Sequence, residues 1–189
     1  MAVGPGSVAQ RAARIIAVAP VGRAAPAVVR HLHSVLEDTF GREVIDAPGL
    51  PLALRAYRPA RGQWLATDLL DALAPTRAAR CERILGVAEV DLFVPDLNFV
   101  FGVADAALGA ALFSLARLVA PRDPQRTLRR AATEAVHELG HTYGLGHCKD
   151  PRCAMWFSNT LAETDRKGAR LCARDAAALR RATALNDAD

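Results

Sequence analysis

Three histidines and a glutamate lie within one short stretch of the last third of the chain, HELGHTYGLGH, which runs from His137 to His147. His137 and His141 are four residues apart, so on a helix their imidazoles share one face and can bind one metal ion. Glu138 can then reach a water molecule held by that ion without binding the ion itself. Gly144 can adopt the left-handed conformation that ends a helix, so the chain can turn back and present His147 as a third ligand.

Three neutral nitrogen ligands leave the fourth tetrahedral position of a zinc ion open to water, which is typical of catalytic zinc. Zinc lowers the pKa of that water to about 7, so hydroxide is available at neutral pH. Glu138 could accept the proton of this water and later deliver it to a leaving amine. The pattern therefore predicts a zinc-dependent hydrolase with Glu138 as its catalytic base.

The residues after the motif narrow the comparison to one family. Cys148 follows the third histidine directly, and Cys153 and Met155 come shortly after it. With these residues, the segment 134–157 resembles the archaemetzincin family of zinc-dependent metallopeptidases, in the metzincin clan. The resemblance implies an α/β (α+β) fold with a twisted mixed five-stranded sheet, a backing helix and an active-site helix. It also implies a small C-terminal subdomain with a Met-turn and a C-terminal helix. Met155 would then lie beneath the metal as a packing floor, although an ordinary core methionine would be equally buried.

The resemblance also implies a second, structural zinc site built from cysteines. In the family pattern a CxxC pair follows the methionine, whereas here Asp175 stands at the position of the last cysteine. The predicted ligands are Cys148, Cys153, Cys172 and Asp175. A carboxylate can bind zinc, so this set is chemically acceptable. Asp150 or a water molecule remain alternatives for the fourth ligand. Three buried cysteines without metal, or a disulfide between the first two, also remain open.

Length and composition predict a single domain over residues 1–189. The resemblance implies that this catalytic domain has an upper subdomain over about 1–147 and a lower one over about 148–189. The chain has 189 residues, and its net charge of +4 comes from 24 basic and 20 acidic residues. This charge does not call for a nucleic-acid partner. The apolar run 15–21 contains Pro20 and is too short for a signal peptide or a membrane span. We therefore expect a cytoplasmic monomer without a membrane partner, in which Cys81 belongs to the core.

The predicted function is hydrolysis of peptide bonds in a peptide or small protein substrate. One alternative is a non-catalytic structural protein that binds two zinc ions. Glu138 argues against it, because a structural site has no use for a carboxylate beside an open coordination position. A second alternative, a metal-dependent hydrolase of a non-peptide amide, is compatible with the same residues.

The elements that must position these residues follow from hydrophobic periodicity and from helix and turn signals. Strands are expected over 14–21, 43–46, 84–93 and 97–104, and the segment 109–119 is ambiguous between helix and strand. Helices are expected over 25–40, over 66–84 with a break at Pro75, from Asp123–Pro124 to about 143, and over 161–183. The segment 48–62 reads as a loop. By resemblance, the strand at 97–104 or the one after it would be the sheet edge along which a substrate pairs.

Overall fold

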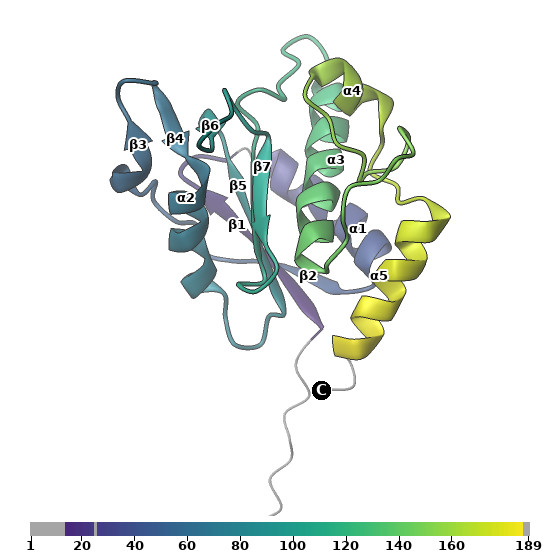
Figure 1. The fold of residues 1–189 in the computed structure, drawn as a ribbon. Helices are drawn as coiled ribbons and strands as arrows, with labels where there is room; N and C mark the ends of the chain where they lie inside the picture. Colours follow the sequence, from purple (N-terminus) through teal and green to yellow (C-terminus); the bar gives the residue numbers. More distant parts are fainter. Residues whose placement is uncertain (1–13, 25, 187–189) are drawn as a thin grey trace, which may run out of the picture.

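The computed structural model describes residues 14–24 and 26–186, and a five-stranded mixed sheet lies at its centre (Figure 1). In spatial order the strands are β2 (Glu43–Asp46), β1 (Ile15–Val21), β5 (Arg83–Ala88), β8 (Ala110–Ser114) and β7 (Gly102–Asp105). The first four run parallel, and β7 pairs antiparallel with β8 at one edge. The mixed five-stranded sheet predicted from the resemblance is confirmed.

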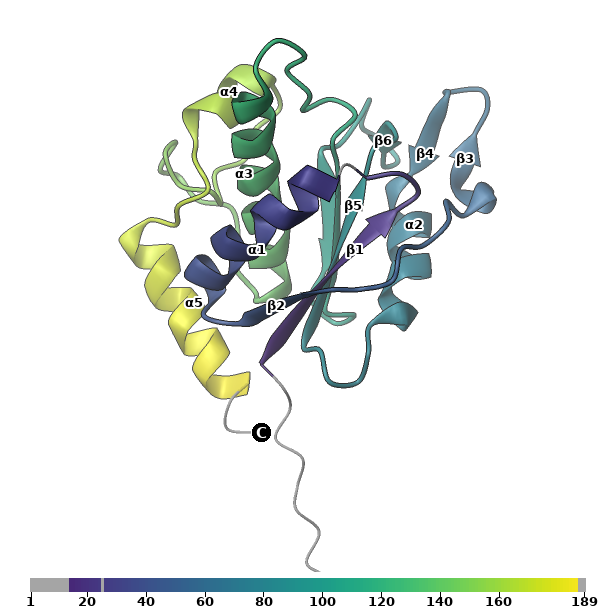
Figure 2. The same cartoon turned by 180° about the vertical axis from the view of Figure 1, so that it is seen from behind.

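Both faces of the sheet are covered, because successive strand residues point to opposite sides. Ile16, Val18 and Leu85 pack against α1 (Pro26–Phe40) and α3 (Pro124–Thr142) on one face. Ala17 and Leu112 pack on the other face with α2 (Ala66–Leu73). Figure 2 shows α1 lying across the sheet as the backing helix. The two apolar cores hold β7 and α3 side by side as rigid elements.

Helix α3 is well defined at both ends by its own residues. The Asp123 carboxylate accepts a hydrogen bond from the backbone N–H of Arg126 at 2.9 Å, and Pro124 occupies the first helical position. At the other end Gly144 adopts a φ of 80°, which lets the chain turn back after Thr142. The predicted start and end of this helix are confirmed.

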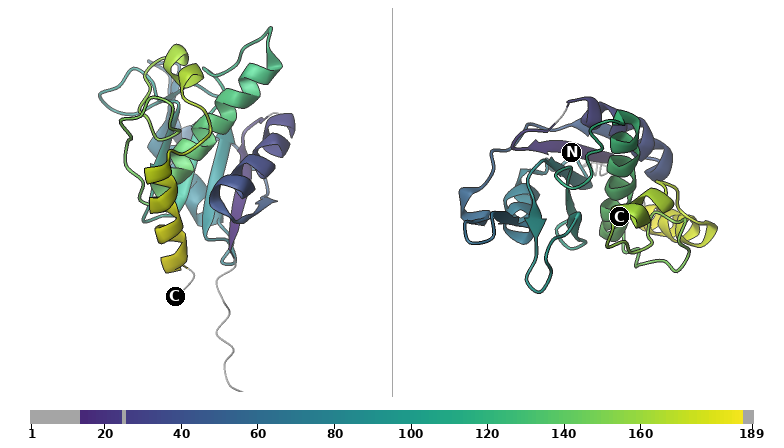
Figure 3. Two further views of the ribbon diagram at one scale, coloured as in Figure 1. Left: turned by 90° about the vertical axis from the view of Figure 1, so that its right-hand side faces the viewer. Right: turned by 90° about the horizontal axis from the view of Figure 1, so that it is seen from above.

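After α3 the chain forms a region with little regular structure that includes two helices, α4 (Leu161–Arg166) and α5 (Ala173–Asn186) (Figure 3). The prediction of one helix over 161–183 is therefore wrong. Thr160 and Glu163 form a capping box that begins α4, and the backbone turns extended at Lys167, with φ −72° and ψ 161°. The extended segment between the two helices carries Cys172 toward the other cysteines.

Several short elements differ from the sequence prediction. The break predicted at Pro75 is confirmed, because α2 stops at Leu73 and continues only as a 3₁₀ turn, η2 (Ala74–Thr76). The helix expected beyond it, up to residue 84, is wrong. The strand predicted over 84–93 divides between β5 and β6 (Leu92–Phe93), and only 102–105 of the segment 97–104 is a strand. The predicted loop 48–62 includes η1 (Leu54–Ala56) and β3 (Tyr57–Arg58). A second sheet, in the order β3, β4 (Gln63–Leu65) and β6, was not predicted.

Among the helices in the described part of the chain, none has the length and apolar character needed to cross a membrane.

Candidate active site

A cleft of about 550 Å³ lies between the edge strand β7 and the helix α3. All four residues of β7 line the cleft on one side, and the segment Phe157–Asn159, which follows α3 in the chain, also lines it. Glu134, His137, Glu138 and His141 reach it from successive turns of α3. The strand predicted as the substrate edge is thus an edge strand that faces the cleft, with its second side free of any partner strand among the described residues.

The three histidines of the motif converge at this cleft. One ring nitrogen of each of His137, His141 and His147 lies within 4.8 Å of the others, and the Nε2 atoms of His137 and His141 are 3.1 Å apart. The Nδ1 atom of His137 contacts the carbonyl oxygen of Ala154 at 2.8 Å, and that of His141 contacts the carbonyl oxygen of Leu145 at 2.8 Å. A carbonyl only accepts, so Nδ1 carries the proton in both rings and Nε2 presents its lone pair.

This arrangement fits a tetrahedral zinc ion. With zinc–nitrogen bonds of about 2.0–2.1 Å, two ligand nitrogens should lie about 3.3 Å apart, close to the 3.1 Å observed. Burial lowers the pKa of His137 well below its ordinary value, and the nearby Lys167 ammonium lowers it further. Burial likewise lowers the pKa of His141 and of His147. The three rings are therefore neutral at pH 7, which is the state that binds a metal ion.

Glu138 lies beside the histidines without joining them. Burial raises the pKa of its carboxyl well above the ordinary value, and the adjacent Glu134 carboxylate raises it further. A raised pKa suits a group that must accept and return a proton near neutral pH. The carboxyl also lies against β7, because a Cβ added at Gly102 would be 2.7 Å from Glu138 Oε1. A glycine at this strand position therefore leaves the space that Glu138 occupies.

Met155 packs against the helical turn that carries His137 and His141. It is fully buried, and a Cβ added at Gly140 would lie only 2.5 Å from its sulfur. Gly140 lies on the helical turn between His137 and His141, so the methionine supports the turn that carries both rings. The preceding residue, Ala154, accepts the hydrogen bond from His137. The Met-turn thus positions the histidines both by packing and by hydrogen bonding.

The cysteine cluster forms a second group with the spacing of a metal site. Single ligand atoms of Cys148, Cys153, Cys172 and Asp175 all lie within 4.8 Å of one another. The Sγ atoms of Cys148 and Cys172 are 3.8 Å apart, and Asp175 Oδ2 lies 3.2 Å from Cys153 Sγ and 3.5 Å from Cys172 Sγ. A tetrahedral zinc ion with sulfur bonds of about 2.3 Å requires sulfurs about 3.8 Å apart. These four residues therefore fit zinc in the same way as the histidines.

Two of the alternatives left open for this cluster, a disulfide and Asp150 as fourth ligand, do not match the geometry. All four cysteines of the chain are free, so the disulfide between Cys148 and Cys153 is not present, and Cys81 is buried in the core as expected. The Asp150 carboxylate instead accepts a hydrogen bond from the backbone of Arg152. Burial opposes ionisation of Asp175, but hydrogen bonds from Arg174 and the thiols outweigh it and lower its pKa to about 2. Asp175 is thus an anionic fourth member of the cluster.

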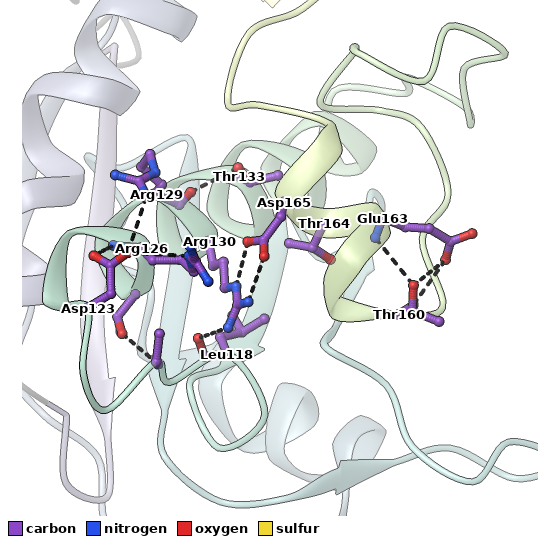
Figure 4. A network of polar contacts seen from close by, with 12 residues as sticks. Leu118, Asp123, Arg126, Arg129, Arg130, Thr133, Thr160, Glu163, Thr164 and Asp165 are labelled. Atoms are coloured by element: carbon purple, nitrogen blue, oxygen red, sulfur yellow. Dashed lines mark hydrogen bonds and ion pairs between the residues drawn. The ribbon is translucent and has the colours of Figure 1, made fainter.

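An ion pair that was not predicted from the sequence joins helix α4 to α3. Arg130 donates from Nε and Nη2 to the two carboxylate oxygens of Asp165, at 2.6 and 2.7 Å, and from Nη1 to the carbonyl of Leu118 (Figure 4). A second ion pair, between Lys167 and Glu134, joins the end of α4 to the cleft. Glu134, Lys167 and Gly102 are the site residues that sequence reasoning missed. Of these, Lys167 carries the clearest signal, because it is one of only two lysines among 24 basic residues.

The geometry agrees with what comparisons with known proteins show. The model of peptidase family M54 matches residues 51–181. An archaemetzincin of Methanopyrus kandleri is 42% identical over 147 residues, which cover 78% of this chain and 83% of the relative. The crystal structure of archaemetzincin from that organism superposes with a TM-score of 0.85 at 37% identity, covering 94% of this chain and 99% of the other. A zinc-dependent peptidase of Methanocorpusculum labreanum superposes with a TM-score of 0.78 at 28% identity, covering 87% and 99%.

A mixed sheet with an edge strand beside a histidine-bearing helix, closed below by a Met-turn, defines a metallopeptidase of the metzincin type. Within that class, the chain belongs to peptidase family M54, the archaemetzincins. The predicted family, fold class and enzyme class are confirmed.

Proposed function

We propose that this chain hydrolyses peptide bonds with one zinc ion held by His137, His141 and His147. The observation that carries the proposal is the convergence of three neutral, correctly oriented imidazoles beside a buried carboxyl group. A zinc ion bound there would lower the pKa of a water molecule to about 7 and polarise the substrate carbonyl.

The remaining steps fall to residues of the chain. Strand β7 presents free backbone groups along the cleft, so an extended peptide can pair with it as an added strand. Glu138 accepts the proton of the attacking water at its carboxylate and returns it to the leaving amine. Gly102 keeps the Glu138 carboxyl close to the strand that holds the peptide. Substrate and base are thereby placed by two adjacent elements.

We assign the cysteine cluster to a second, structural zinc ion. Cys148, Cys153, Cys172 and Asp175 offer four ligand atoms, which fills a tetrahedral shell and leaves no position for water. The backbone N–H groups of Asp150 and Cys172 point to the sulfurs of Cys148 and Cys153, at 3.4 and 3.3 Å. This ion would tie the loop after His147 to the start of α5, which is why we treat residues 148–189 as a lower subdomain of one catalytic domain.

The same cluster supports a cytoplasmic monomer. Its thiols must stay reduced to bind metal, which is the normal state in a reducing compartment. Every ligand of both sites comes from one chain, so no second copy is needed to complete either site. Sedimentation of the zinc-loaded protein at micromolar concentration should give the mass of a single chain.

The decisive experiment replaces Glu138 with glutamine, which keeps the size of the side chain and removes its basicity. Zinc content should be unchanged, because Glu138 is not a ligand. Hydrolysis of short quenched-fluorescence peptides should fall by about 10²–10⁴ in kcat, with little change in KM. A variant that hydrolyses peptides at the wild-type rate would refute the mechanism. A wild-type protein that cleaves non-peptide amides but no peptide would favour the amide hydrolase.

A further inference from the structure

A buried ion pair lies beside the cleft, and one of its two members, Glu134, lines the cleft without a role in the proposed reaction. Glu134 is one turn before Glu138 on α3 and lines the same cleft. Its Oε1 atom lies 3.2 Å from the Nζ atom of Lys167, and the side chains of the two residues are 3% and 0% exposed. Such a pair is costly to desolvate and contributes little to stability compared with apolar residues of the same size. Its presence beside a substrate cleft therefore calls for a functional reading.

Neighbouring hydrogen bonds hold the ion pair in place, and both donors to Glu134 contact the same oxygen, Oε1. Thr164 donates to Glu134 Oε1 at 3.4 Å, and Lys167 donates a further hydrogen bond to the carbonyl of Trp156 at 3.2 Å. Thr164 also contacts the hydroxyl of Ser158 at 3.2 Å, and Ser158 lines the cleft. These contacts fix the position of the Glu134 carboxylate relative to Thr164 on α4 and to the segment that carries Ser158.

The second carboxylate oxygen, Glu134 Oε2, has no hydrogen-bond partner among residues 14–24 and 26–186. Both donors approach Oε1, so Oε2 is the oxygen left to accept a hydrogen bond in the cleft. Oε2 is not among the fully buried unpaired atoms of the described residues, so water in the cleft can reach it. An apolar substrate side chain that displaces this water would leave Oε2 without a partner, whereas a side chain that donates a hydrogen bond would replace the water.

We propose that Glu134, paired with Lys167 behind it, forms a specificity site in the cleft for a neutral, hydrogen-bond-donating side chain of the substrate, such as the carboxamide of glutamine or asparagine. Lys167 already neutralises Glu134, so a substrate cation would bring an unpaired charge into a buried site. A substrate carboxylate would meet the Glu134 carboxylate directly, because Glu134 lines the cleft and Lys167 does not. The proposal deepens the peptidase assignment and names a substrate class for the same cleft.

The compact ammonium of Lys167 is consistent with this role. The chain uses arginine for 22 of its 24 basic residues, yet it has a lysine here, fully buried, where a guanidinium would be larger and flat. An ammonium can donate to Glu134 and to the Trp156 carbonyl together, which leaves the cleft side of the carboxylate open.

The test uses peptides that differ at one position only, with glutamine, methionine, lysine or glutamate placed in turn at each position near the scissile bond. Binding is measured by calorimetry on the zinc-loaded Glu138→Gln protein, so that turnover is not required. At one position the glutamine peptide should bind at least about tenfold more tightly than the methionine peptide, which has nearly the same shape. Equal affinity at every position, or preference for lysine, would overturn the proposal.

A matched double variant, Glu134→Met with Lys167→Met, removes both charges at nearly constant size. It should reverse the preference, so that the methionine peptide binds more tightly than the glutamine peptide. A purely structural pair would instead weaken all peptides by the same factor, and that result would also overturn the proposal. The peptide comparison on the native pair decides the question even where the double variant does not fold.

The outcomes separate this proposal from the peptidase assignment. Glutamine-selective binding without hydrolysis of any peptide by the protein with Glu138 intact would refute the assignment and retain the specificity site. Hydrolysis without selectivity for glutamine would retain the assignment and refute the specificity site.

Discussion

Replacing Gly102 with alanine should disable catalysis without removing the metal. The added Cβ would lie 2.6 Å from Glu138 Cγ and 2.6 Å from the carbonyl oxygen of Leu112. Carbon atoms in good contact are about 3.5–4.0 Å apart, so the Glu138 side chain must move by about 1 Å. A displacement of this size at a catalytic group can cost about 100-fold in rate. Overpacking of this kind typically destabilises a protein by about 1–3 kcal/mol.

The control is Gly86→Ala on strand β5, which β8 separates from β7. A Cβ there would lie 2.7 Å from side-chain atoms of Leu112 and Leu73, so the strain is similar but does not involve Glu138. Both variants should lose stability in urea unfolding, and both should keep their zinc by elemental analysis. Only Gly102→Ala should lose about 100-fold in kcat on a quenched-fluorescence peptide, at a temperature where both variants are folded. A wild-type kcat for Gly102→Ala, or an equal loss for Gly86→Ala, would refute the reasoning.

Two further predictions concern the metal sites and one ion pair. Cys172→Ala should lower the zinc content by one ion per chain and lower Tm, because binding of a structural ion contributes to folding. His141→Ala should abolish activity with a smaller change in Tm. Equal losses of Tm in the two variants would contradict the division into a catalytic and a structural site. The hydrogen bonds from Arg130 hold the pKa of Asp165 below its ordinary value of 3.8, so the pair stabilises the fold above that pH and the contribution disappears as the pH falls through the lower, folded-state pKa. Asp165→Asn should therefore be less stable than wild type at pH 6 and no less stable near pH 2, as measured by urea unfolding at both values.

The parts of the site that depend on local geometry could be predicted from the sequence. The four-residue spacing of His137 and His141 places both rings on one helical face, and Gly144 is the residue type that such a turn requires. The start of α3 at Asp123–Pro124 was readable for the same reason. Each of these inferences involves residues close together in the chain, for which backbone rules are sufficient.

The parts that depend on distant contacts could not be predicted. Glu134 and Lys167 look like ordinary solvated charges in sequence, because nothing local shows that both are buried against each other. The sequence does not show that Gly102 lies against Glu138, because that contact depends on how α3 packs beside the strand. The single helix expected over 161–183 was wrong for a related reason. The helix ends at Lys167, whose buried side chain contacts Glu134 and the carbonyl of Trp156, both of which lie outside the segment 161–183.

The adjacency of His147 and Cys148 links the third histidine of the cleft directly to the cysteine cluster. His147 is exposed and follows two glycines, whereas Cys148 is buried and its N–H is bonded to the carbonyl of Met155 at 2.8 Å. The third histidine is therefore held from both sides, by the buried Leu145 that precedes it and by the cysteine-rich loop that follows it. An ion bound by the cysteines would stiffen that loop, and with it the backbone on the C-terminal side of His147. Oxidation of the thiols could thus silence the peptidase from outside the cleft, while His137 and His141 stay in place.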